Sequence, residues 1–473
     1  MQLRPYQQKA DDEIVAAWAS GKKRVFLQLP TGGGKTVMFN HRAAVAARKG
    51  KRVLIIADRR ELIQQAWSRL WQAANIHAGI ILSGHPQNHA LPIQIASIQT
   101  LNRRTFPPNI DMVIIDEARG SVADSYKTVF SHYKDAYFLG VDATPIRTTG
   151  QGFDHLYNHM VIGPTIKELE ALGSLVPARP FVNPLDQRIL DRVKITAGDY
   201  NEKQLAEVMS DKTLTADLVQ SKLKHAPGLK TIVFAVSIAH SKMIIEQYND
   251  AGIKAMHVDG EMSMEDRASI FKRFKNGDFE VLCNVGIACY GFDEPSIQCV
   301  QLARPTKSLA LYLQQVGRGT RPYTLPTGEK KEKYILLDHA NCVMEFGMPN
   351  SERRWQLKGR KKEAQRPRQF KIKMDGEEKI VTAKDYPHGV EGLELQEIDE
   401  LTLRMAEFKK IMDHARDKGY KPLSCVFRYT DKFPDAGADE LKQIEKLLNF
   451  KQGWWRYKLK DLEENRNKKA QTA

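Results

Sequence analysis

Pro30-Thr31-Gly32-Gly33-Gly34-Lys35-Thr36 lies between the apolar run Val25 to Leu29 and a stretch with helical spacing. A strand, a glycine turn and a helix in this order predict a loop that cradles phosphate groups. Because glycine has no Cβ, the loop can turn its backbone N–H groups around a triphosphate at the N-terminus of the helix. We expect Lys35 to meet the β- and γ-phosphate oxygens and Thr36 to hold magnesium.

Two adjacent carboxylates follow another apolar run. Asp116 and Glu117 come directly after Met112 to Ile115, at the expected end of a strand. One carboxylate there can hold magnesium while its neighbour orients or deprotonates an attacking water. We expect Asp116 to be the metal ligand and Glu117 the catalytic group. A solvated Asp-Glu pair is also common at strand ends, so this assignment depends on the glycine loop.

A third segment with chemical content is Gln314-Gln315-Val316-Gly317-Arg318-Gly319-Thr320-Arg321. Ser308 is a suitable N-cap for a helix with an apolar stripe that is predicted to end at Pro322. The spacing puts Arg318 and Arg321 together on one face of this helix, which is different from the apolar face. Two guanidinium groups there suit arginine fingers that reach a γ-phosphate held by another domain. The alternative is a basic surface helix.

Length and charge narrow the class of protein. The chain has 473 residues, a formal charge of +15 and a pI near 9.4. This length suggests about three domains of roughly 150 residues each. The positive charge favours a polyanionic partner, because neutralised phosphates release counterions and drive nucleic-acid binding without sequence specificity. The alternative is a charge that serves solubility alone.

The sequence carries no membrane or secretion signal. No apolar run approaches the roughly 18 to 20 residues that cross a bilayer. Met1 to Tyr6 lacks an apolar signal segment, and the five cysteines include no Cys-x-x-Cys pair. We therefore expect a cytoplasmic protein with neither disulfides nor a structural zinc, and no membrane partner.

Two series of short apolar runs predict two α/β domains. From Arg24 to Ile162 such runs alternate with helix-like stretches, and a second series runs from Thr231 to Leu337. Between them, Lys167 to Lys224 is more polar and mostly helical in pattern. The expected parts are a first domain at 1–165, a helical connection at 166–225 and a second domain at 226–345.

Residues 346–473 are expected to form a small, mainly helical, basic domain that could bind nucleic acid. Ten Lys or Arg residues lie between Arg353 and Lys373, in either a solvated linker or a basic arm for nucleic acid. Trp454, Trp455 and Tyr457 could stack on the bases of a single strand. The alternative, which we favour, is that these aromatics form the core of a small helical domain.

As a set, these segments resemble those of superfamily 2 helicases, most closely the bacterial RadD-type repair helicases and related phage helicases. Further matching segments are Leu3 to Gln7, Asp142 to Pro145 and Gly291 to Asp293. The resemblance implies two tandem RecA-like α/β domains, each with a parallel sheet, that share an ATP site and a nucleic-acid track. The implied activity is magnesium-dependent ATP hydrolysis coupled to unwinding or remodelling of branched DNA in replication, recombination or repair. It implies a bacterial cytoplasm and a bacterial, phage or prophage gene.

The same resemblance implies individual contacts. It places Gln7 against adenine, with Arg4 and Tyr6 shaping the base pocket, and it gives Asp293 a nucleotide contact from the second domain. The residues expected to contact nucleic acid are Arg59, Arg60, Ser97, Gln99, Thr100, Ser237, Asn284, Gly286 and Gly291.

Some positions depart from the family pattern or have a second explanation. Arg119 stands where relatives usually have His, Asp or another residue that couples hydrolysis to the second domain, and Asp142 replaces a small hydroxyl residue. The cysteine-rich C-terminal region of RadD relatives has no counterpart, so the tail is closer to that of phage relatives. Asp58 and Glu61, around the expected strand contacts, also have the spacing of a capping box.

The expected partner is DNA, single-stranded or branched, with RNA as the alternative, and the sequence identifies no protein partner. Three other functions stay open. They are an RNA helicase, a translocase that strips proteins from nucleic acid, and a nucleic-acid-binding scaffold with weak ATPase activity.

Overall fold

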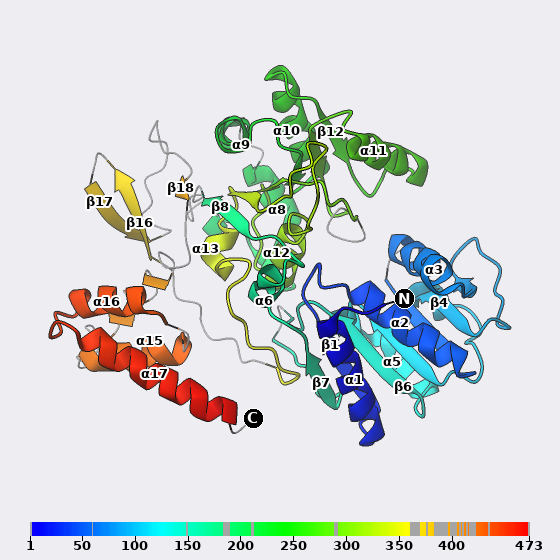
Figure 1. Ribbon diagram of the computed structural model, residues 1–473. Helices are drawn as coiled ribbons and strands as arrows, with labels where there is room; N and C mark the ends of the chain where they lie inside the picture. Colours follow the sequence, from blue (N-terminus) through cyan, green and yellow to red (C-terminus); the bar gives the residue numbers. More distant parts are fainter. Residues whose placement is uncertain are drawn as a thin grey trace. The chain divides into compact units, whose positions relative to one another are not determined.

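The computed structural model describes residues 2–58, 60–147, 150–182, 190–209, 212–287, 292–359, 369–374, 377–382, 396–397, 404–405, 408, 411–412, 415, 422–433 and 436–471. The chain divides into two compact units (Figure 1). The first unit comprises Met1–Arg179, Val193–Ala340 and Pro349–Glu363. The second comprises Pro180–Arg192, Asn341–Met348 and Ala364–Ala473.

Seven parallel strands form the first sheet, in the order β3-β4-β2-β5-β6-β1-β7. The strands are β1 (Arg24–Gln28), β2 (Val53–Ala57), β3 (Ala78–Ile81), β4 (Ile93–Ser97), β5 (Met112–Asp116), β6 (Tyr137–Asp142) and β7 (His159–Ile162). Every residue of β2, β4 and β5 is buried. Parallel strands with both faces covered have this continuous apolar character.

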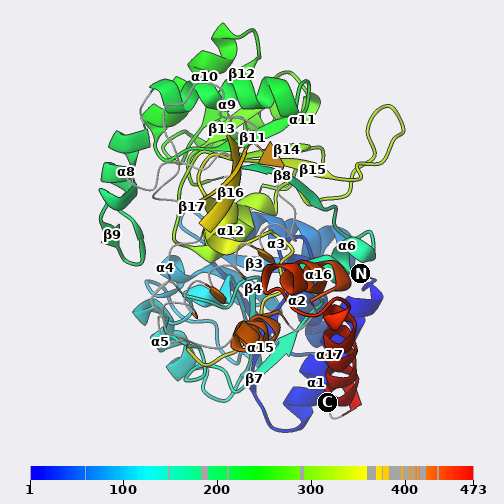
Figure 2. The ribbon, with the colours of Figure 1, turned by 90° about the vertical axis from the view of Figure 1, so that its left-hand side faces the viewer.

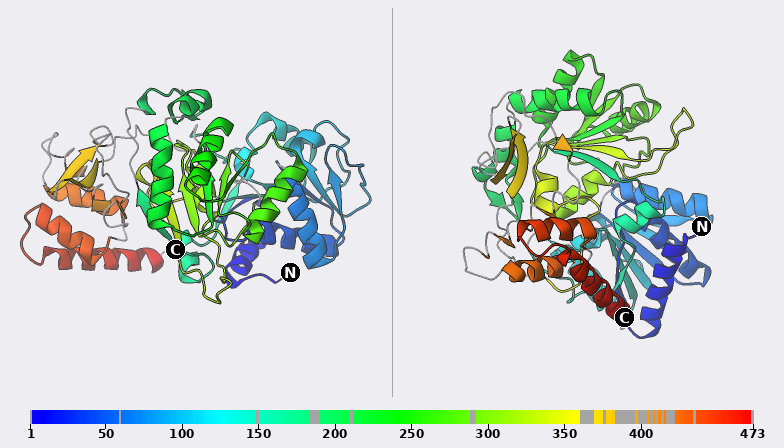
Figure 3. Two further views of the ribbon diagram at one scale, coloured as in Figure 1. Left: turned by 90° about the horizontal axis from the view of Figure 1, so that it is seen from above. Right: turned by 60° about the vertical axis from the view of Figure 1, so that its left-hand side comes forward.

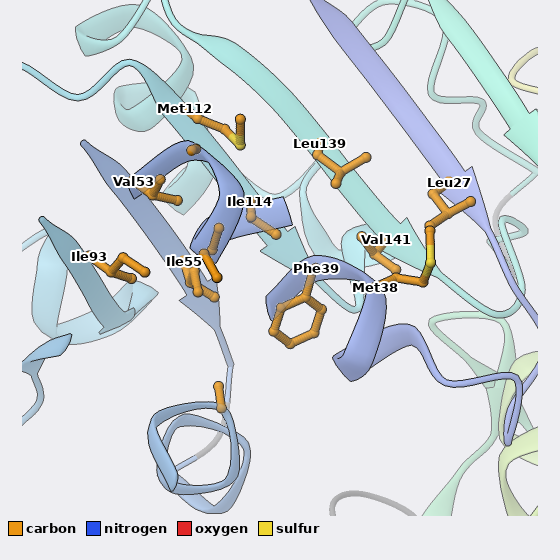
Figure 4. Close-up of a cluster of buried hydrophobic side chains, with 14 of the residues drawn as sticks. Leu27, Met38, Phe39, Val53, Ile55, Ile93, Met112, Ile114, Leu139 and Val141 are labelled. Atoms are coloured by element: carbon orange, nitrogen blue, oxygen red, sulfur yellow. The ribbon is translucent and has the colours of Figure 1, made fainter. Parts of the chain in front are cut away.

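Helices cover both faces of this sheet. The elements are α1 (Pro5–Ala19), α2 (Lys35–Arg48), α3 (Arg60–Ala74), α4 (Ile98–Leu101), the 3-10 turn η1 (Ala118–Gly120) and α5 (Asp124–His132). Successive strand residues point to opposite faces, so Leu27 packs with α1, α2 and α3 while Phe26 packs with α4 and α5. Figure 4 shows Phe39 of α2 among Ile55, Ile114 and Val141 of the strands.

A second parallel sheet has the order β12-β13-β11-β14-β15 within the first unit. Its strands are β11 (Thr231–Phe234), β12 (Ala255–Val258), β13 (Val281–Asn284), β14 (Cys299–Leu302) and β15 (Tyr334–Asp338). The helices around it are α9 (Lys212–His225), α10 (Ile238–Asp250), α11 (Met264–Asn276) and α12 (Leu309–Val316) (Figure 2). Leu218 of α9 and Tyr248 of α10 pack on Val233 and Cys283. The prediction of two tandem α/β domains is confirmed.

The connection between the two sheets is only partly helical. It contains α6 (Ile166–Ala171), α8 (Glu202–Met209) and the start of α9, together with the strands β8 (Ala178–Val182), β9 (Ile195–Thr196) and β10 (Asp199–Tyr200). β9 and β10 pair as an antiparallel hairpin. Pro177 and Pro180 lack the N–H group that a helix interior needs, so the chain is extended there. The connection therefore combines the expected helices with short strands.

Residues 349–359, which we call the return strap, leave the second domain and pack on the first. The amide of Phe153 donates to the carbonyl of Leu357 at 2.6 Å. The Leu357 side chain packs against the core beneath α4 and α5. A Cβ at Gly152 would lie 2.2 Å from the Gly359 nitrogen, so the two chains approach backbone to backbone. The start of the basic run at Arg353 therefore has a fixed place.

The second unit is mainly helical, as predicted, and contains one hairpin. Its elements are α13 (Cys342–Phe346), β16 (Gln369–Met374), β17 (Glu377–Thr382), β18 (Gln396–Glu397), α15 (Pro422–Lys432), α16 (Ala438–Leu447) and α17 (Trp454–Gln471) (Figure 3). β16 and β17 pair antiparallel, and β18 pairs antiparallel with the end of β8. The last part of the basic run is thus a strand, and residues 360–368 lie outside the described part.

The tail aromatics divide into two kinds. Phe408, Tyr429 and Leu441 form a buried core between the last helices, and Trp454 and Trp455 pack against it. Tyr457 is 81% exposed. The core interpretation therefore holds for the two tryptophans, while Tyr457 faces solvent. No helix in the described ranges is both long and apolar enough to span a bilayer.

Candidate active site

The glycine loop joins β1 to α2, and Lys35 is the first residue of that helix. Gly32 and Gly34 have φ angles of 88° and 89°, which glycine adopts without strain. A Cβ at Gly34 would lie 2.4 Å from Gln7 Nε2, and one at Gly32 would lie 2.6 Å from Leu175 Cδ2. The loop therefore requires glycine, and its amides lie at a helix N-terminus that attracts phosphate.

The segment at the start of α1 braces this loop. Gln7, which is only 4% exposed, donates from Nε2 to the Gly33 carbonyl at 3.1 Å. The hydroxyl of Tyr6 donates to the same carbonyl at 3.0 Å. The amide of Arg4 donates to Gln7 Oε1 at 3.0 Å, which fixes the orientation of the carboxamide. The structure thus brings the three residues expected at the base pocket to the glycine loop.

The carboxylate pair lies at the end of β5. Asp116 is buried, and Glu117 has left-handed backbone angles of 49° and 49°. Burial, together with the neighbouring Glu117 charge, raises the pKa of Asp116 to about 7, and the Lys35 ammonium opposes that rise. A buried carboxylate of this kind is suited to bind a cation, because the cation restores the charged form.

The residues around the loop fit a triphosphate with magnesium. Thr31 Oγ1, Thr144 Oγ1 and Gln314 Oε1 are buried with no hydrogen-bond partner among the described residues. No group of three or more metal-ligand side chains gathers anywhere in the described ranges. Magnesium commonly takes one or two protein ligands and completes its shell with phosphate oxygens and water. Thr36 and Asp116 are such a sparse set.

Glu117 is contacted by one side chain from each of the two α/β domains. Arg119 Nη2 lies 2.9 Å from Glu117 Oε2, and Gln314 Nε2 of α12 donates to the same oxygen at 3.0 Å. Arg119 also reaches the buried Asp142, with Nη1 lying 3.1 Å from Oδ1. The two departures from the family pattern, Arg119 and Asp142, are therefore ion-paired to each other.

The predicted helix that would carry both arginine fingers ends earlier than expected. α12 stops at Val316, and Gly317 caps it, so Arg318 and Arg321 lie beyond the helix instead of sharing one of its faces. A Cβ at Gly319 would lie 2.3 Å from the Tyr334 ring, and this close packing turns the chain away from the helical path.

Both arginines nevertheless reach one loop. Arg318 donates from Nη1 to the Phe292 carbonyl, and Arg321 Nη2 lies 3.4 Å from Asp293 Oδ1. Asp293 also pairs with Arg69 of α3, at 3.4 Å. Asp293, the residue expected to contact the nucleotide from the second domain, is therefore paired with Arg69 of the first domain and Arg321 of the second.

The expected strand contacts of the first domain occupy two places. Ser97 caps α4 by accepting from the Thr100 amide at 3.1 Å, and Gln99 donates to Asp58 Oδ1 at 2.8 Å. Arg60 instead donates to the Ser83 carbonyl at 3.0 Å. Ser97, Gln99 and Thr100 are thus brought together, and Arg60 lies apart from them. Arg59 lies outside the described residues.

The expected strand contacts of the second domain are partly structural. Ser237 caps α10 by accepting from the His240 amide at 3.1 Å. Asn284 is fully buried and donates to the Val233 carbonyl at 2.8 Å. Gly286 has a φ of 71°, so a side chain there would be strained. Gly291 lies outside the described part of the chain.

Two cavities lie beside these residues. One, of about 420 Å³, is lined by Asp58, Gln99, Glu117, Arg119 and Arg147, among others. It connects the predicted strand contacts at Gln99 with the Glu117 carboxylate. The other, of about 960 Å³, is lined by Arg60, Arg69, Arg267 and Asp293, among others. Arg60 and Arg69 of the first domain and Arg267 of the second therefore line the same cavity.

Lys331 is a buried lysine beside the candidate site that the sequence did not single out. Its ammonium donates to the carbonyls of Pro295, Ile297 and Gly319 at 2.8 to 3.0 Å, and so ties the loop after Asp293 to the segment that follows α12. In the sequence it is one of several lysines in a basic turn. No local pattern distinguishes this buried lysine from one that is exposed to solvent. In the sequence, Arg119 and Asp142 appear only as two departures from the family pattern, and nothing there indicates that they pair.

Two family matches cover most of the two sheets. Residues 1–147 match the family described as "Type III restriction enzyme, res subunit". Residues 213–322 match "Helicase conserved C-terminal domain".

Relatives extend the match across both domains. The chain is 32% identical to a 51.5 kDa protein of Lactococcus phage (isolate 7-9) over 329 residues, which is 70% of this chain and 68% of that protein. It is 33% identical over 340 residues to the putative ATP-dependent helicase IRC3 of Saccharomyces cerevisiae, covering 67% of this chain. The chain spans about two thirds of the phage protein but only about half of the yeast one, 49%.

Solved structures share the fold. A fragment of a putative HsdR subunit of a type I restriction enzyme from Vibrio vulnificus aligns with a TM-score of 0.56 and 22% identity, covering 73% of this chain and 66% of that one. The ATP-dependent restriction-modification enzyme LlaBIII bound to DNA aligns with a TM-score of 0.56 and 17% identity, covering 72% of this chain and 28% of that one.

Proposed function

The chain belongs to the superfamily 2 helicases and is an ATP hydrolase, and from this premise we propose that it couples hydrolysis to movement along DNA. Unwinding or remodelling of branched DNA is the proposed output. The observation that carries the proposal is the 3.0 Å hydrogen bond from Gln314 to Glu117. It makes the carboxylate at the end of the first sheet sensitive to the position of a helix on the second.

We propose the following roles at the nucleotide. Lys35 and the amides of the Thr31–Thr36 loop bind the phosphates, and Thr36 and Asp116 hold magnesium. Bound magnesium supplies charge that neutralises the phosphate oxygens. Glu117 orients the attacking water. Arg4, Tyr6 and Gln7 form the adenine side, where Gln7 links the base to the loop through the Gly33 carbonyl.

Arg318 and Arg321 act as arginine fingers after a change of partners. Arg321 pairs with Asp293 in this structure, and Arg318 is engaged with the Phe292 carbonyl. A triphosphate carries more charge than either partner and competes for both guanidinium groups. We propose that this exchange draws the segment after α12 toward the glycine loop, while Asp293 turns to the nucleotide.

We propose that the nucleic-acid strand passes the ends of β2 and β4, beside the 420 Å³ cavity. Ser97, Gln99 and Thr100 hold its backbone on the first domain, and Ser237 and Gly286 on the second. Asn284 supports this surface from within. The formal charge of +15 favours a polyanion, and phosphate contacts of this kind read charge and shape more than sequence.

We propose DNA over RNA because of two of the similar proteins, although other relatives are described as RNA helicases. One relative is the type I restriction enzyme EcoKI endonuclease subunit of Escherichia coli, with 24% identity over 67% of this chain and 33% of that protein. The LlaBIII structure holds DNA. We propose DNA for this chain, single-stranded or branched, on the basis of these descriptions.

The test is ATPase and strand-separation activity on matched substrates. Duplex, forked and four-way DNA are compared with RNA of the same sequence and geometry, with magnesium and with EDTA. We expect forked or four-way DNA to stimulate hydrolysis and to be separated, with no activity in EDTA. Equal or stronger activity on RNA would reject the DNA assignment. Stimulation without strand separation would support a translocase instead.

A further inference from the structure

Asp142 is a carboxylate in the interior of the first domain, with 0% exposure at the end of β6. Its Oδ2 accepts from the Arg119 amide at 2.8 Å. Its Oδ1 accepts from the Thr144 amide at 2.9 Å and from Arg119 Nη1 at 3.1 Å. The buried charge is therefore satisfied by two backbone donors and one guanidinium, and removal of the guanidinium would leave it without a countercharge.

Arg119 joins this buried carboxylate to the half-buried carboxylate of Glu117. Nη1 is directed to Asp142, while Nη2 lies 2.9 Å from Glu117 Oε2. The guanidinium is planar, so the direction of Nη1 fixes the direction of Nη2. Asp142 thereby determines where Arg119 presents its second donor.

Glu117 receives that donor on one oxygen only. Oε2 accepts a hydrogen bond from Gln314 at 3.0 Å and is ion-paired with Arg119 Nη2 at 2.9 Å, and among the described residues no hydrogen bond reaches Oε1. These two contacts on one oxygen restrain the carboxylate. Glu117 also lines the 420 Å³ cavity, so we take Oε1 to be the oxygen available to a water.

We propose that Arg119 is the positioning residue of the hydrolytic carboxylate and that Asp142 is its anchor, so that the two unusual residues function as one matched pair. This inference rests on the proposed role of Glu117. Arg119 does not contact the reacting atoms. It holds Glu117 at the angle from which Oε1 addresses the attacking water, and it does so most firmly when Gln314 supplies the second donor.

If Arg119 and Asp142 function as one pair, single and double substitutions should affect stability and turnover in different ways. Loss of Arg119 leaves the Asp142 charge buried and unpaired, which destabilises the fold. Loss of Asp142 takes the acceptor from the Arg119 and Thr144 amides and leaves the Arg119 guanidinium with Glu117 alone. Loss of both removes the unpaired charge but not the cost of the two amides, so the double variant should be more stable than Arg119→Met and less stable than wild type. The Arg119 guanidinium is absent from Arg119→Met and from the double variant, so turnover stays low in both.

The experiment compares Arg119→Met, Asp142→Leu, the double variant Arg119→Met/Asp142→Leu, and Arg119→Lys with the wild-type full chain. Steady-state ATPase is measured at saturating single-stranded DNA, with thermal unfolding of the same samples. Arg48→Met is the matched control, because Arg48 donates to the Ala74 carbonyl at 3.2 Å at the opposite end of α2 from Lys35.

We expect kcat to fall about 100-fold in Arg119→Met and in the double variant, with KM for ATP within about threefold of wild type. The melting temperature should drop in each single variant, and in the double variant it should lie between those of Arg119→Met and wild type. Arg119→Lys should keep the charge and most of the melting temperature but lose turnover, since one ammonium cannot present two donors in a fixed fork. Arg48→Met should match wild type in kcat.

Three results bear against the pair. A double variant with wild-type kcat would show that the ion pair stabilises the fold and has no part in turnover. Wild-type kcat in Arg119→Met would remove Arg119 from the mechanism. If the single variants do not fold, the double variant decides alone. A wild-type protein without ATPase activity would overturn the proposed function and this inference with it, whereas an active wild type confines any failure to the pair.

Discussion

Glu117 is the residue on which the proposed chemistry depends most directly. Glu117→Gln retains the shape of the side chain and can still accept from Gln314 through its carbonyl oxygen, so ATP binding through Lys35 should persist. The amide is a far weaker base and orients water poorly, so kcat should fall about 100-fold or more. ATP binding and single-turnover hydrolysis measure the two effects separately. Glu246→Gln, on an exposed position of α10, is the control, and full turnover in Glu117→Gln would remove Glu117 from the mechanism.

Arg321 should affect the transition state more than the ground state. Its present partner is Asp293, so Arg321→Ala costs an exposed ion pair of little stability. A finger that engages on closure lowers kcat by about 100-fold or more when removed, with a small change in KM. Arg273→Ala, which removes an exposed arginine paired with Asp278, is the matched control. Weak ATP binding with normal turnover would contradict the assignment.

The turn that carries Lys331 adds a pH-dependent element. Burial and the nearby Arg321 charge lower the pKa of Lys331 from 10.5 to about 7. The unfolded chain keeps the proton up to about pH 10.5, so from pH 7 upward it binds more protons than the folded protein and stability rises with pH. Lys331→Met removes this gain. Its deficit in melting temperature should therefore be larger at pH 9 than at pH 6.5, and an equal deficit at both would contradict the shift.

The local sequence pattern predicted the strands and the glycine loop, because a buried parallel strand appears in the sequence as a short run of apolar residues. The end of α12 was predicted at Pro322 and lies at Val316, because packing of Gly319 against Tyr334 stops the helix and no periodicity reports that contact. The Arg119 to Asp142 pair joins residues 23 positions apart and had no sequence signal beyond being unusual. Contacts of this kind depend on strand order, which the sequence does not spell out.

The last helices offer a test of what the tail aromatics do. Trp454 packs on Phe450 with ring centroids 4.7 Å apart, so Trp454→Ala should lower the free energy of unfolding of this region by about 2 kcal/mol. Tyr457 is exposed, so Tyr457→Ala should change stability by less than about 0.5 kcal/mol. If Tyr457 stacks on bases, its loss should weaken single-strand binding by about 1 kcal/mol. Thermal unfolding and fluorescence anisotropy of labelled oligonucleotides measure the two, and unchanged affinity would exclude stacking.

The net charge of the whole chain predicts a strong effect of salt on DNA binding. Contact with even four phosphates of a single strand would lower affinity roughly fiftyfold between 50 and 200 mM salt. Binding isotherms over that range give the slope directly. Ser97→Ala, which removes a cap and a proposed contact but no charge, should weaken binding without changing the slope. A flat salt dependence for the wild type would contradict phosphate-driven binding.

The return strap has a consequence for how the protein is made. The hydrophobic layer beneath α4 and α5 is completed by Leu357, which the ribosome adds about two hundred residues after the last strand of that sheet. Domains generally fold as units from the N-terminus during synthesis. Here the first sheet emerges with one apolar position still uncovered, and it is sealed only after the second sheet has left the exit tunnel. Packing of the first domain is therefore completed only after the second domain has been synthesised.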